Sequence, residues 1–137
     1  PTLRQTIELS CEKYPVDKER IIVAGLSGGG MTAHVLSYTY PELVSAIVVN
    51  TGMMMDLYRA EKETYPRNKI AVFLASPTDF RYKEMQRDKR MLDELGWKTK
   101  WIEFEGGHRP APQSDYLKAA EWIQGQFKSE KAIGGKK

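Results

Sequence analysis

The chain has 137 residues, which fits one domain by the usual range of about 100–200 residues. Apolar residues make up 41% and charged residues 28%, an ordinary globular composition that excludes disorder of the chain as a whole. A single cysteine and two histidines leave little for a disulfide or a metal site, and no apolar run approaches the roughly 18 residues of a membrane span. We therefore expect no metal and no membrane partner.

The formal net charge of +3 is concentrated at the end of the chain. Residues 128–137 contain four lysines and one glutamate, so residues 1–127 are neutral. We expect residues 1–127 to form the folded core and residues 128–137 to be a disordered Lys/Gly tail. Basic residues interleaved with aromatics are missing from the core sequence, which argues against a nucleic-acid partner.

Helical and strand patterns alternate along the chain. In chain order we predict a helix over residues 2–14, a strand over 21–24, a helix over 31–40, a strand over 46–49, a polar segment over 56–68, a strand over 70–75, a helix over 82–95, a strand over 100–104 and a helix over 116–127. The strands are short apolar runs typical of buried parallel strands. This order predicts an α/β fold with three layers, in which helices flank both faces of a parallel sheet. The ligand site of such a sheet lies beyond the carboxyl ends of its strands.

The turn between the first strand and the second helix has the sequence Gly-Leu-Ser-Gly-Gly-Gly over residues 25–30. It matches G-x-S-x-G in the strand–turn–helix context that a nucleophile requires, so Ser27 is the candidate nucleophile. We expect glycine at positions 25 and 29 because side chains there would clash. The Gly28 N–H and the helix dipole would stabilise an oxyanion. Glycine-rich turns also bind phosphate, but this one lacks the lysine of a P-loop and the spacing of a dinucleotide motif.

A serine nucleophile needs a general base within hydrogen-bond reach. His34 lies inside the helix that follows Ser27, roughly 10 Å along its axis at 1.5 Å per residue, so we interpret it as a packing or surface residue. His108 follows the fourth strand in a glycine-containing loop, on the same edge of the sheet as Ser27. His108 is therefore the candidate base.

The third member of a triad is a carboxylate that orients the histidine. Asp79 follows the third strand and Asp56 follows the second, and both suit the chain order Ser, Asp, His. We favour Asp79 because its strand should neighbour the one that carries His108. Helix capping is the structural alternative for Asp79, and Asp56 stays open as the acid.

These residues resemble the α/β-hydrolase superfamily. Residues 14–30 contain the turn Tyr-Pro-Val-Asp, an arginine and the nucleophile strand. They resemble bacterial esterases of the polyhydroxybutyrate-depolymerase, feruloyl-esterase and dienelactone-hydrolase-like type. Residues 70–79 and 106–108 resemble the acid strand and the histidine loop of that superfamily. The resemblance implies the second half of an α/β-hydrolase fold.

The sequence departs from the family pattern before residue 2. The strand with the oxyanion motif, often His-Gly-Gly, is missing from the printed sequence, so the second oxyanion donor is missing too. We expect the chain to be the carboxyl-terminal half of a longer hydrolase, and its activity without upstream sequence stays open. For substrate contacts we name Leu26, Met53 in a Met-Met-Met run, and Arg109. Core filling is the alternative for the methionines and a solvent-facing side chain for Arg109.

The resemblance and the site together predict a serine hydrolase that cleaves small carboxylic esters through Ser27, His108 and Asp79 and an acyl-enzyme, without a cofactor. The alternatives are a serine peptidase of the prolyl-oligopeptidase kind and a catalytically incomplete fragment that keeps the hydrolase shape. The sequence does not name the ester, the oligomeric state or the compartment. No signal segment is seen in the chain, while the resemblance allows a periplasmic or secreted protein.

Overall fold

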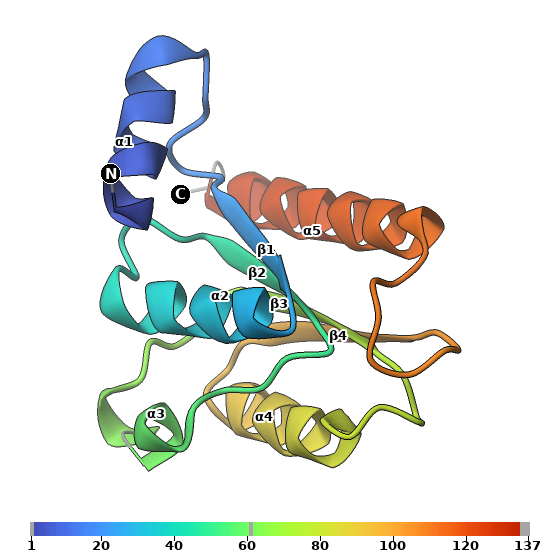
Figure 1. Ribbon diagram of the computed structural model, residues 1–137. Coiled ribbons are helices and arrows are strands. Elements are labelled where there is room, and N and C mark those ends of the chain that lie inside the picture. The colour runs from blue at the N-terminus through green and yellow to red at the C-terminus, as the bar shows by residue number, and fades with distance from the viewer. Residues whose placement is uncertain (1, 61, 135–137) are drawn as a thin grey trace.

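A computed structural model describes residues 2–60 and 62–134 of the chain as four parallel strands flanked by helices (Figure 1). The elements are α1 (Leu3–Lys13), β1 (Ile22–Leu26), α2 (Gly28–Thr39), β2 (Ala46–Asn50), α3 (Asp56–Ala60), a 3-10 helix (Lys62–Thr64), β3 (Ile70–Ala75), α4 (Tyr82–Glu94), β4 (Lys98–Glu103) and α5 (Gln113–Gly134). The strands pair in the order β1-β2-β3-β4, so each strand neighbours the next one along the chain. The predicted α/β class and parallel sheet are confirmed.

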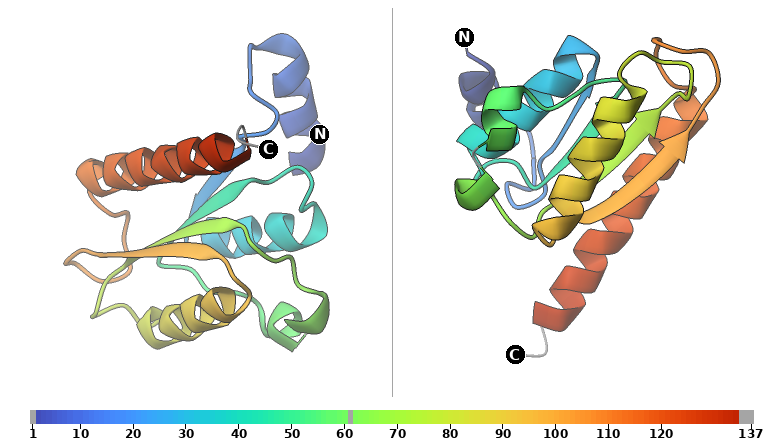
Figure 2. Two further views of the ribbon diagram at one scale, coloured as in Figure 1. Left: turned by 180° about the vertical axis from the view of Figure 1, so that it is seen from behind. Right: turned by 90° about the horizontal axis from the view of Figure 1, so that it is seen from below.

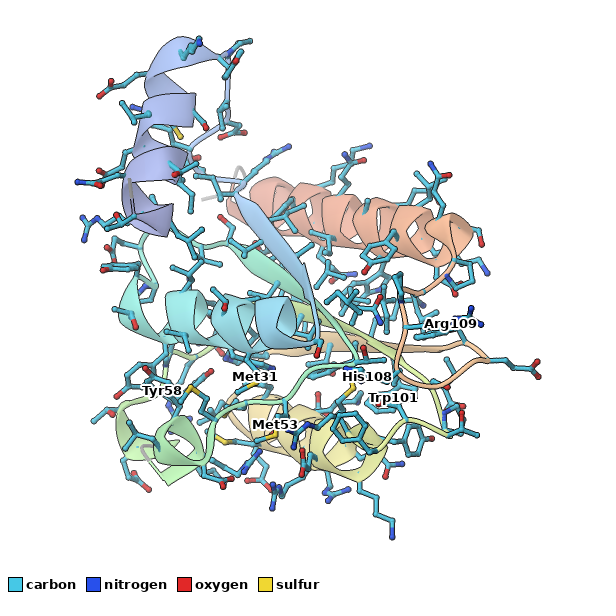
Figure 3. The ribbon with its side chains drawn as sticks, viewed as in Figure 1. Met31, Met53, Tyr58, Trp101, His108 and Arg109 are labelled. Atoms are coloured by element: carbon cyan, nitrogen blue, oxygen red, sulfur yellow. The ribbon has the colours of Figure 1, made fainter. Side chains whose placement is uncertain are left out.

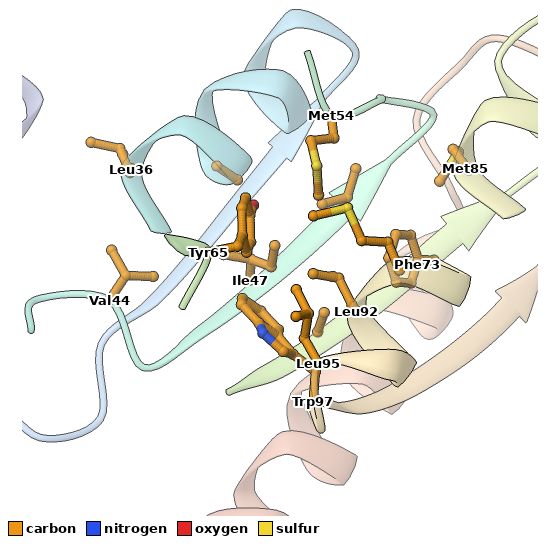
Figure 4. Close-up of a cluster of buried hydrophobic side chains, with 14 of the residues drawn as sticks. Leu36, Val44, Ile47, Met54, Tyr65, Phe73, Met85, Leu92, Leu95 and Trp97 are labelled. Carbon is orange, nitrogen blue, oxygen red and sulfur yellow. The ribbon is translucent and has the colours of Figure 1, made fainter. Parts of the chain in front are cut away.

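The two faces of the sheet are covered by different helices (Figure 2). Alternate residues of β2 and β3 point to opposite faces, as strand geometry requires. Ile47 and Phe73 belong to the core on the side of α2 and α4, which Figure 4 shows. Val48 and Val72 pack on the other side, against Ile123 of α5. Every residue of β2 and β3 is buried, which explains why these strands read as continuous apolar runs.

The strand predicted at residues 21–24 has the apolar pattern of a buried strand but lies at the side of the sheet. β1 forms one edge of the sheet, and its residues alternate between exposed and half-buried. Ile22 and Leu26 expose 37% and 38% of their surface. The strand reads as a core strand because it is entirely apolar, but in the described structure it has a neighbour on one side only.

The ends of the chain also differ from the predictions. α1 forms where the pattern predicts, with a capping box between Thr2 and Gln5, but none of its residues is buried. α5 continues through Gly134, so the tail expected to be disordered from Lys128 begins as helix. Residues 135–137 lie outside the described residues. Within the described parts of the chain, none of the helices has the length and apolar character to cross a bilayer.

A buried ion pair beneath α3 joins the segment after β2 to α4. Asp88 on α4 is fully buried and accepts hydrogen bonds from the Arg59 guanidinium at 2.7 Å and from the Met54 N–H at 2.7 Å. Arg59 also donates to the Met54 carbonyl at 2.9 Å. The hydrogen bonds oppose a desolvation that raises the pKa of Asp88. The pair therefore fixes the start of α3 to the α4 layer.

His34 is fully buried on the α2 side of the core. Within residues 2–60 and 62–134 neither ring nitrogen has a hydrogen-bond partner. Its ring centroid lies 6.4 Å from that of Phe73. Burial, with a smaller contribution from the Arg59 charge, lowers the pKa of His34 to about 3. His34 is therefore a packing residue, one of the two roles that the sequence predicted for it.

Replacing Arg59 with alanine should leave Asp88 as an uncompensated buried charge. We expect the Arg59→Ala change to lower the free energy of unfolding by about 3–5 kcal/mol, measured by urea denaturation. Arg87 is a matched control, because it is half-exposed and lies 3.9 Å from the exposed Asp56. The Arg87→Ala change should cost less than about 0.5 kcal/mol. Equal costs for the two variants would contradict the role given to the Arg59–Asp88 pair.

His34 should make the fold sensitive to acid. Its pKa is lower in the folded chain than the usual 6.5, so the unfolded chain binds the proton more readily and stability falls as the pH drops from about 6.5 toward 3. Between pH 6.5 and 4.5 this amounts to about 2–3 kcal/mol. The His34→Leu variant should lose that part of the acid dependence in urea unfolding across this range. If the free energy of unfolding had the same pH dependence in the two proteins, the role given to His34 would be refuted.

Candidate active site

The parallel register aligns the carboxyl ends of all four strands. Leu26, Asn50, Leu74 and Ile102 are paired across the sheet in that order. The loops that follow β1, β3 and β4 therefore leave from one edge, and they carry the three candidate residues of the triad. Residues more than 80 positions apart in the chain meet at this edge because the strands are parallel.

Ser27 occupies a strained turn between β1 and α2. Its φ is 54° and its ψ is −113°, a conformation that costs a non-glycine residue about 1–3 kcal/mol. The Ser27 N–H donates to the Asn50 carbonyl at 2.8 Å, which helps to hold the turn. Ser27 is also the N-cap of α2, yet its side chain makes no capping hydrogen bond. The hydroxyl therefore points away from the helix that it begins.

The glycines of the turn have separate roles. A Cβ at position 25 would lie 2.2 Å from the carbonyl carbon and oxygen of Gly29, so the turn tolerates only glycine there. A Cβ at position 29 would meet nothing within 4 Å, so the predicted clash at Gly29 is wrong. Close packing instead involves Gly30, where a Cβ would lie 3.0 Å from Val49, and Gly52, where it would lie 2.8 Å from the Ser27 carbonyl oxygen. These contacts bring α2 and the segment after β2 close together.

His108 links the serine to a buried carboxylate. Its Nε2 lies 2.8 Å from the Ser27 Oγ, and its Nδ1 lies 2.8 Å from the Asp79 Oδ1. An ionised carboxylate only accepts hydrogen bonds, so Nδ1 carries the proton and Nε2 accepts from the serine hydroxyl. The Asp79 side chain is fully buried, while His108 keeps 32% of its side-chain surface exposed. Asp79, which the sequence favoured, thus lies in contact with the imidazole.

The other two candidates lie elsewhere. His34 is buried within α2 and has no contact with Ser27. Asp56 begins α3, exposes 84% of its side chain and pairs with Arg59 and Arg87. The structure therefore brings His108 and Asp79 to Ser27 and leaves Asp56 in a surface ion pair.

The loop that presents His108 depends on polar residues that sequence reasoning missed. Gly106 and Gly107 precede the histidine with φ values of 123° and 77°, a region that favours glycine. The Gly107 N–H donates to the buried Ser76 Oγ at 2.9 Å. On the other side of the histidine, the buried Asn50 side chain bonds to two backbone groups of the loop. The available signal was a polar residue directly after an apolar strand, at the carboxyl end where parallel sheets usually carry their ligand sites.

One apolar side chain contacts His108, and others follow the strands at the same end of the sheet. The Phe80 ring lies 4.6 Å from the imidazole of His108, centroid to centroid, and exposes 67% of its surface. Leu26 is 38% exposed. Of the methionine run, Met53 is half-buried and Met54 belongs to the core. Figure 3 labels Met53 and His108 in the region between α2 and α4.

Arg109 follows the histidine and is exposed. The Asn50 side chain holds its backbone carbonyl, while its own side chain lies against Gly106. In the described residues we find no cluster of three or more His, Cys, Asp or Glu side chains that could hold a metal ion.

Gly28 begins α2, so its N–H is one of the donors that a helix leaves without an intrahelical acceptor. This N–H, together with the positive end of the helix dipole, is available to a negatively charged atom beside Ser27.

Solved structures with the same fold include hydrolases. A carboxylesterase from Bacillus cereus matches with a TM-score of 0.69 and 20% identity over 89% of this chain. An esterase named PE8 matches with a TM-score of 0.68 and 18% identity over 85% of the chain. An acylaminoacyl peptidase from Pyrococcus horikoshii matches with a TM-score of 0.59 and 19% identity over 74% of the chain. The chain has an α/β-hydrolase-like fold.

The chain spans 57% of the Bacillus cereus carboxylesterase, 55% of PE8 and 22% of the acylaminoacyl peptidase. It therefore corresponds to a part of each of these larger structures. No protein-family model and no curated protein sequence matches the chain.

The two glycines on either side of Ser27 provide a direct test of the turn. The Gly25→Ala change places a Cβ 2.2 Å from the Gly29 backbone, so we expect it to cost about 3 kcal/mol or more. The Gly29→Ala change meets no atom and should leave stability unchanged or raise it by about 0.5–1 kcal/mol. Thermal unfolding of the two variants measures this difference, and equal melting temperatures would contradict the described geometry.

Proposed function

We propose that this chain carries the catalytic residues of a serine hydrolase that cleaves small carboxylic esters. The observation that supports it is the unbroken hydrogen-bonded series from the Ser27 Oγ through His108 to Asp79, with both distances at 2.8 Å. Ser27 stands on a strained strand-to-helix turn, which is where this chemistry requires its nucleophile. The esterases among the solved structures of the same fold are consistent with the proposal.

In the proposed reaction the Ser27 oxygen attacks the ester carbonyl while His108 Nε2 takes the hydroxyl proton. The negative charge that develops on the carbonyl oxygen is stabilised by the Gly28 N–H and the amino end of α2. His108 then gives its proton to the departing alcohol, which leaves an acyl group on Ser27. Water, activated by the same imidazole, hydrolyses this acyl-enzyme, and Asp79 stabilises the imidazolium in both steps.

The apolar side chains near Ser27 suit the carbon skeleton of an ester. We assign Leu26 and Met53 to contacts with the acyl group and Arg109 to a carboxylate elsewhere on the substrate. The reaction needs no cofactor. Gly28 provides one oxyanion donor, and the loss of one such donor typically slows this chemistry by about a hundred- to a thousandfold.

A fluorophosphonate probe together with p-nitrophenyl acetate tests this function. The probe should form an adduct with Ser27, located by mass spectrometry, and the chain should hydrolyse the ester. The Ser27→Ala change should abolish both, while Asp79→Asn should lower ester hydrolysis by about a thousandfold or more. Ser114→Ala is the matched control, because this serine is exposed on α5 and lies outside the site.

The outcomes separate the alternatives. Labelling of Ser27 without ester hydrolysis, but with cleavage of acylated peptides, would favour a peptidase, a possibility supported by the fold shared with an acylaminoacyl peptidase. A folded chain that neither labels nor hydrolyses any of these substrates would refute the proposal for this chain and favour a catalytically incomplete hydrolase-like fragment.

A further inference from the structure

Asn50 makes contacts on both sides of the site. It is the last residue of β2 and is fully buried. Its backbone carbonyl accepts the Ser27 N–H at 2.8 Å. Its side-chain amide nitrogen donates to the Arg109 carbonyl at 3.3 Å, and its amide oxygen accepts the Ala111 N–H at 2.7 Å. One residue therefore contacts both the serine turn and the loop that presents His108.

The site needs such a link because its two halves come from distant parts of the fold. Ser27 follows β1 and His108 follows β4, which are the two outer strands of the described sheet, with β2 and β3 between them. Gly106 and Gly107 precede the histidine with positive φ, whereas Pro110 and Pro112 restrict the backbone after it. A contact to this stiffer segment from a strand between β1 and β4 can set the distance from the serine to the imidazole.

The chemistry of the contacts requires an amide side chain at position 50. The Asn50 oxygen accepts two hydrogen bonds, from Ala111 and from the Tyr116 hydroxyl at 2.6 Å. The nitrogen faces carbonyl oxygens and therefore must donate. An ionised carboxylate has no donor, and a leucine has neither donor nor acceptor. An amide is the group of this size that supplies both hydrogen-bonding partners to the buried loop.

Tyr116 extends the link to α5. Its hydroxyl binds the Asn50 oxygen, so the first turns of α5 are held to the same point as the histidine loop.

On the opposite side, Gly52 packs so close to Ser27 that a Cβ would lie 2.8 Å from the serine carbonyl oxygen. Asn50 and Gly52 therefore both contact Ser27.

We propose that Asn50 is a positioning residue, which sets the His108 loop relative to Ser27 so that the imidazole and the hydroxyl meet at hydrogen-bond distance. This inference rests on the proposed serine-hydrolase function. It predicts that changes at Asn50 lower the reactivity of Ser27 while the chain stays folded. Displacing reacting groups by about 1 Å can cost a hundredfold in rate.

The main variant is Asn50→Asp, which keeps the size of the side chain and its acceptor but loses the donor to Arg109. We expect the second-order rate constant for phosphonylation of Ser27 to fall by about tenfold or more. In ester hydrolysis kcat should fall while KM changes little, because the Asn50 side chain is fully buried. Val72→Ala is the control for a general loss of stability, because Val72 is fully buried in the middle of β3. It should leave the rate constant unchanged at temperatures where it is folded.

A second measurement does not depend on activity. The low-field NMR resonance of the His108 Nδ1 proton, assigned with the His108→Ala variant, reports the hydrogen bond to Asp79. Asn50→Asp should shift or broaden this resonance, and Val72→Ala should not. If the unaltered chain fails to react with the probe, the proposed function fails, and the resonance alone decides on Asn50.

Tyr116→Phe keeps the inference testable if Asn50→Asp does not fold. It removes one hydrogen bond to the Asn50 oxygen without opening a cavity, and it should slow phosphonylation by about threefold to fivefold. A folded Asn50→Asp variant with the rate constant and the resonance of the unaltered chain would overturn the inference. If Asn50→Asp is unfolded, the same result for Tyr116→Phe would overturn it.

Discussion

The parallel register of the four strands is the constraint on which the rest of the structure depends. Parallel strands begin at one edge of a sheet and end at the other, so every connection returns across a face and every carboxyl end lies at the same side. The serine, the carboxylate and the histidine come from three different loops, and each loop is short. Their meeting follows from the register and requires no long excursion of the chain.

The backbone strain at Ser27 and the close packing of the glycines around it have the same cause, the sharp reversal from β1 into α2. Ser27 holds a positive φ because α2 must begin directly after β1, and the contact between Gly25 and Gly29 shows how little space the reversal leaves. The serine side chain, which in an ordinary helix would cap the first turn, bonds to the imidazole. The Ser27 side chain thus leaves the first N–H groups of α2 uncapped, and its hydroxyl is hydrogen-bonded to the imidazole instead.

Much of the fold could be predicted from the sequence. Short apolar runs identified all four strands, and β3 has the predicted bounds. The apolar pattern was less informative for β1, which is wholly apolar but half-exposed. It also did not predict that α5 extends past Lys128. An apolar run reports that a strand prefers burial, and it carries no information on how many neighbours that strand has.

For the candidate site, the sequence by itself determined which side chains have the necessary chemistry. A chain with two histidines and one G-x-S-x-G turn offers few combinations, and its order along the strands places Ser27, Asp79 and His108 at one edge. Only the tertiary structure showed that Asp79, and not Asp56, lies in contact with His108, that a side chain is tolerated at position 29, and that Asn50, Ser76 and the Arg59–Asp88 pair make buried contacts. The reason is physical: local patterns reflect backbone preference and burial, whereas hydrogen bonds between distant loops depend on distances that exist only after the sheet has assembled.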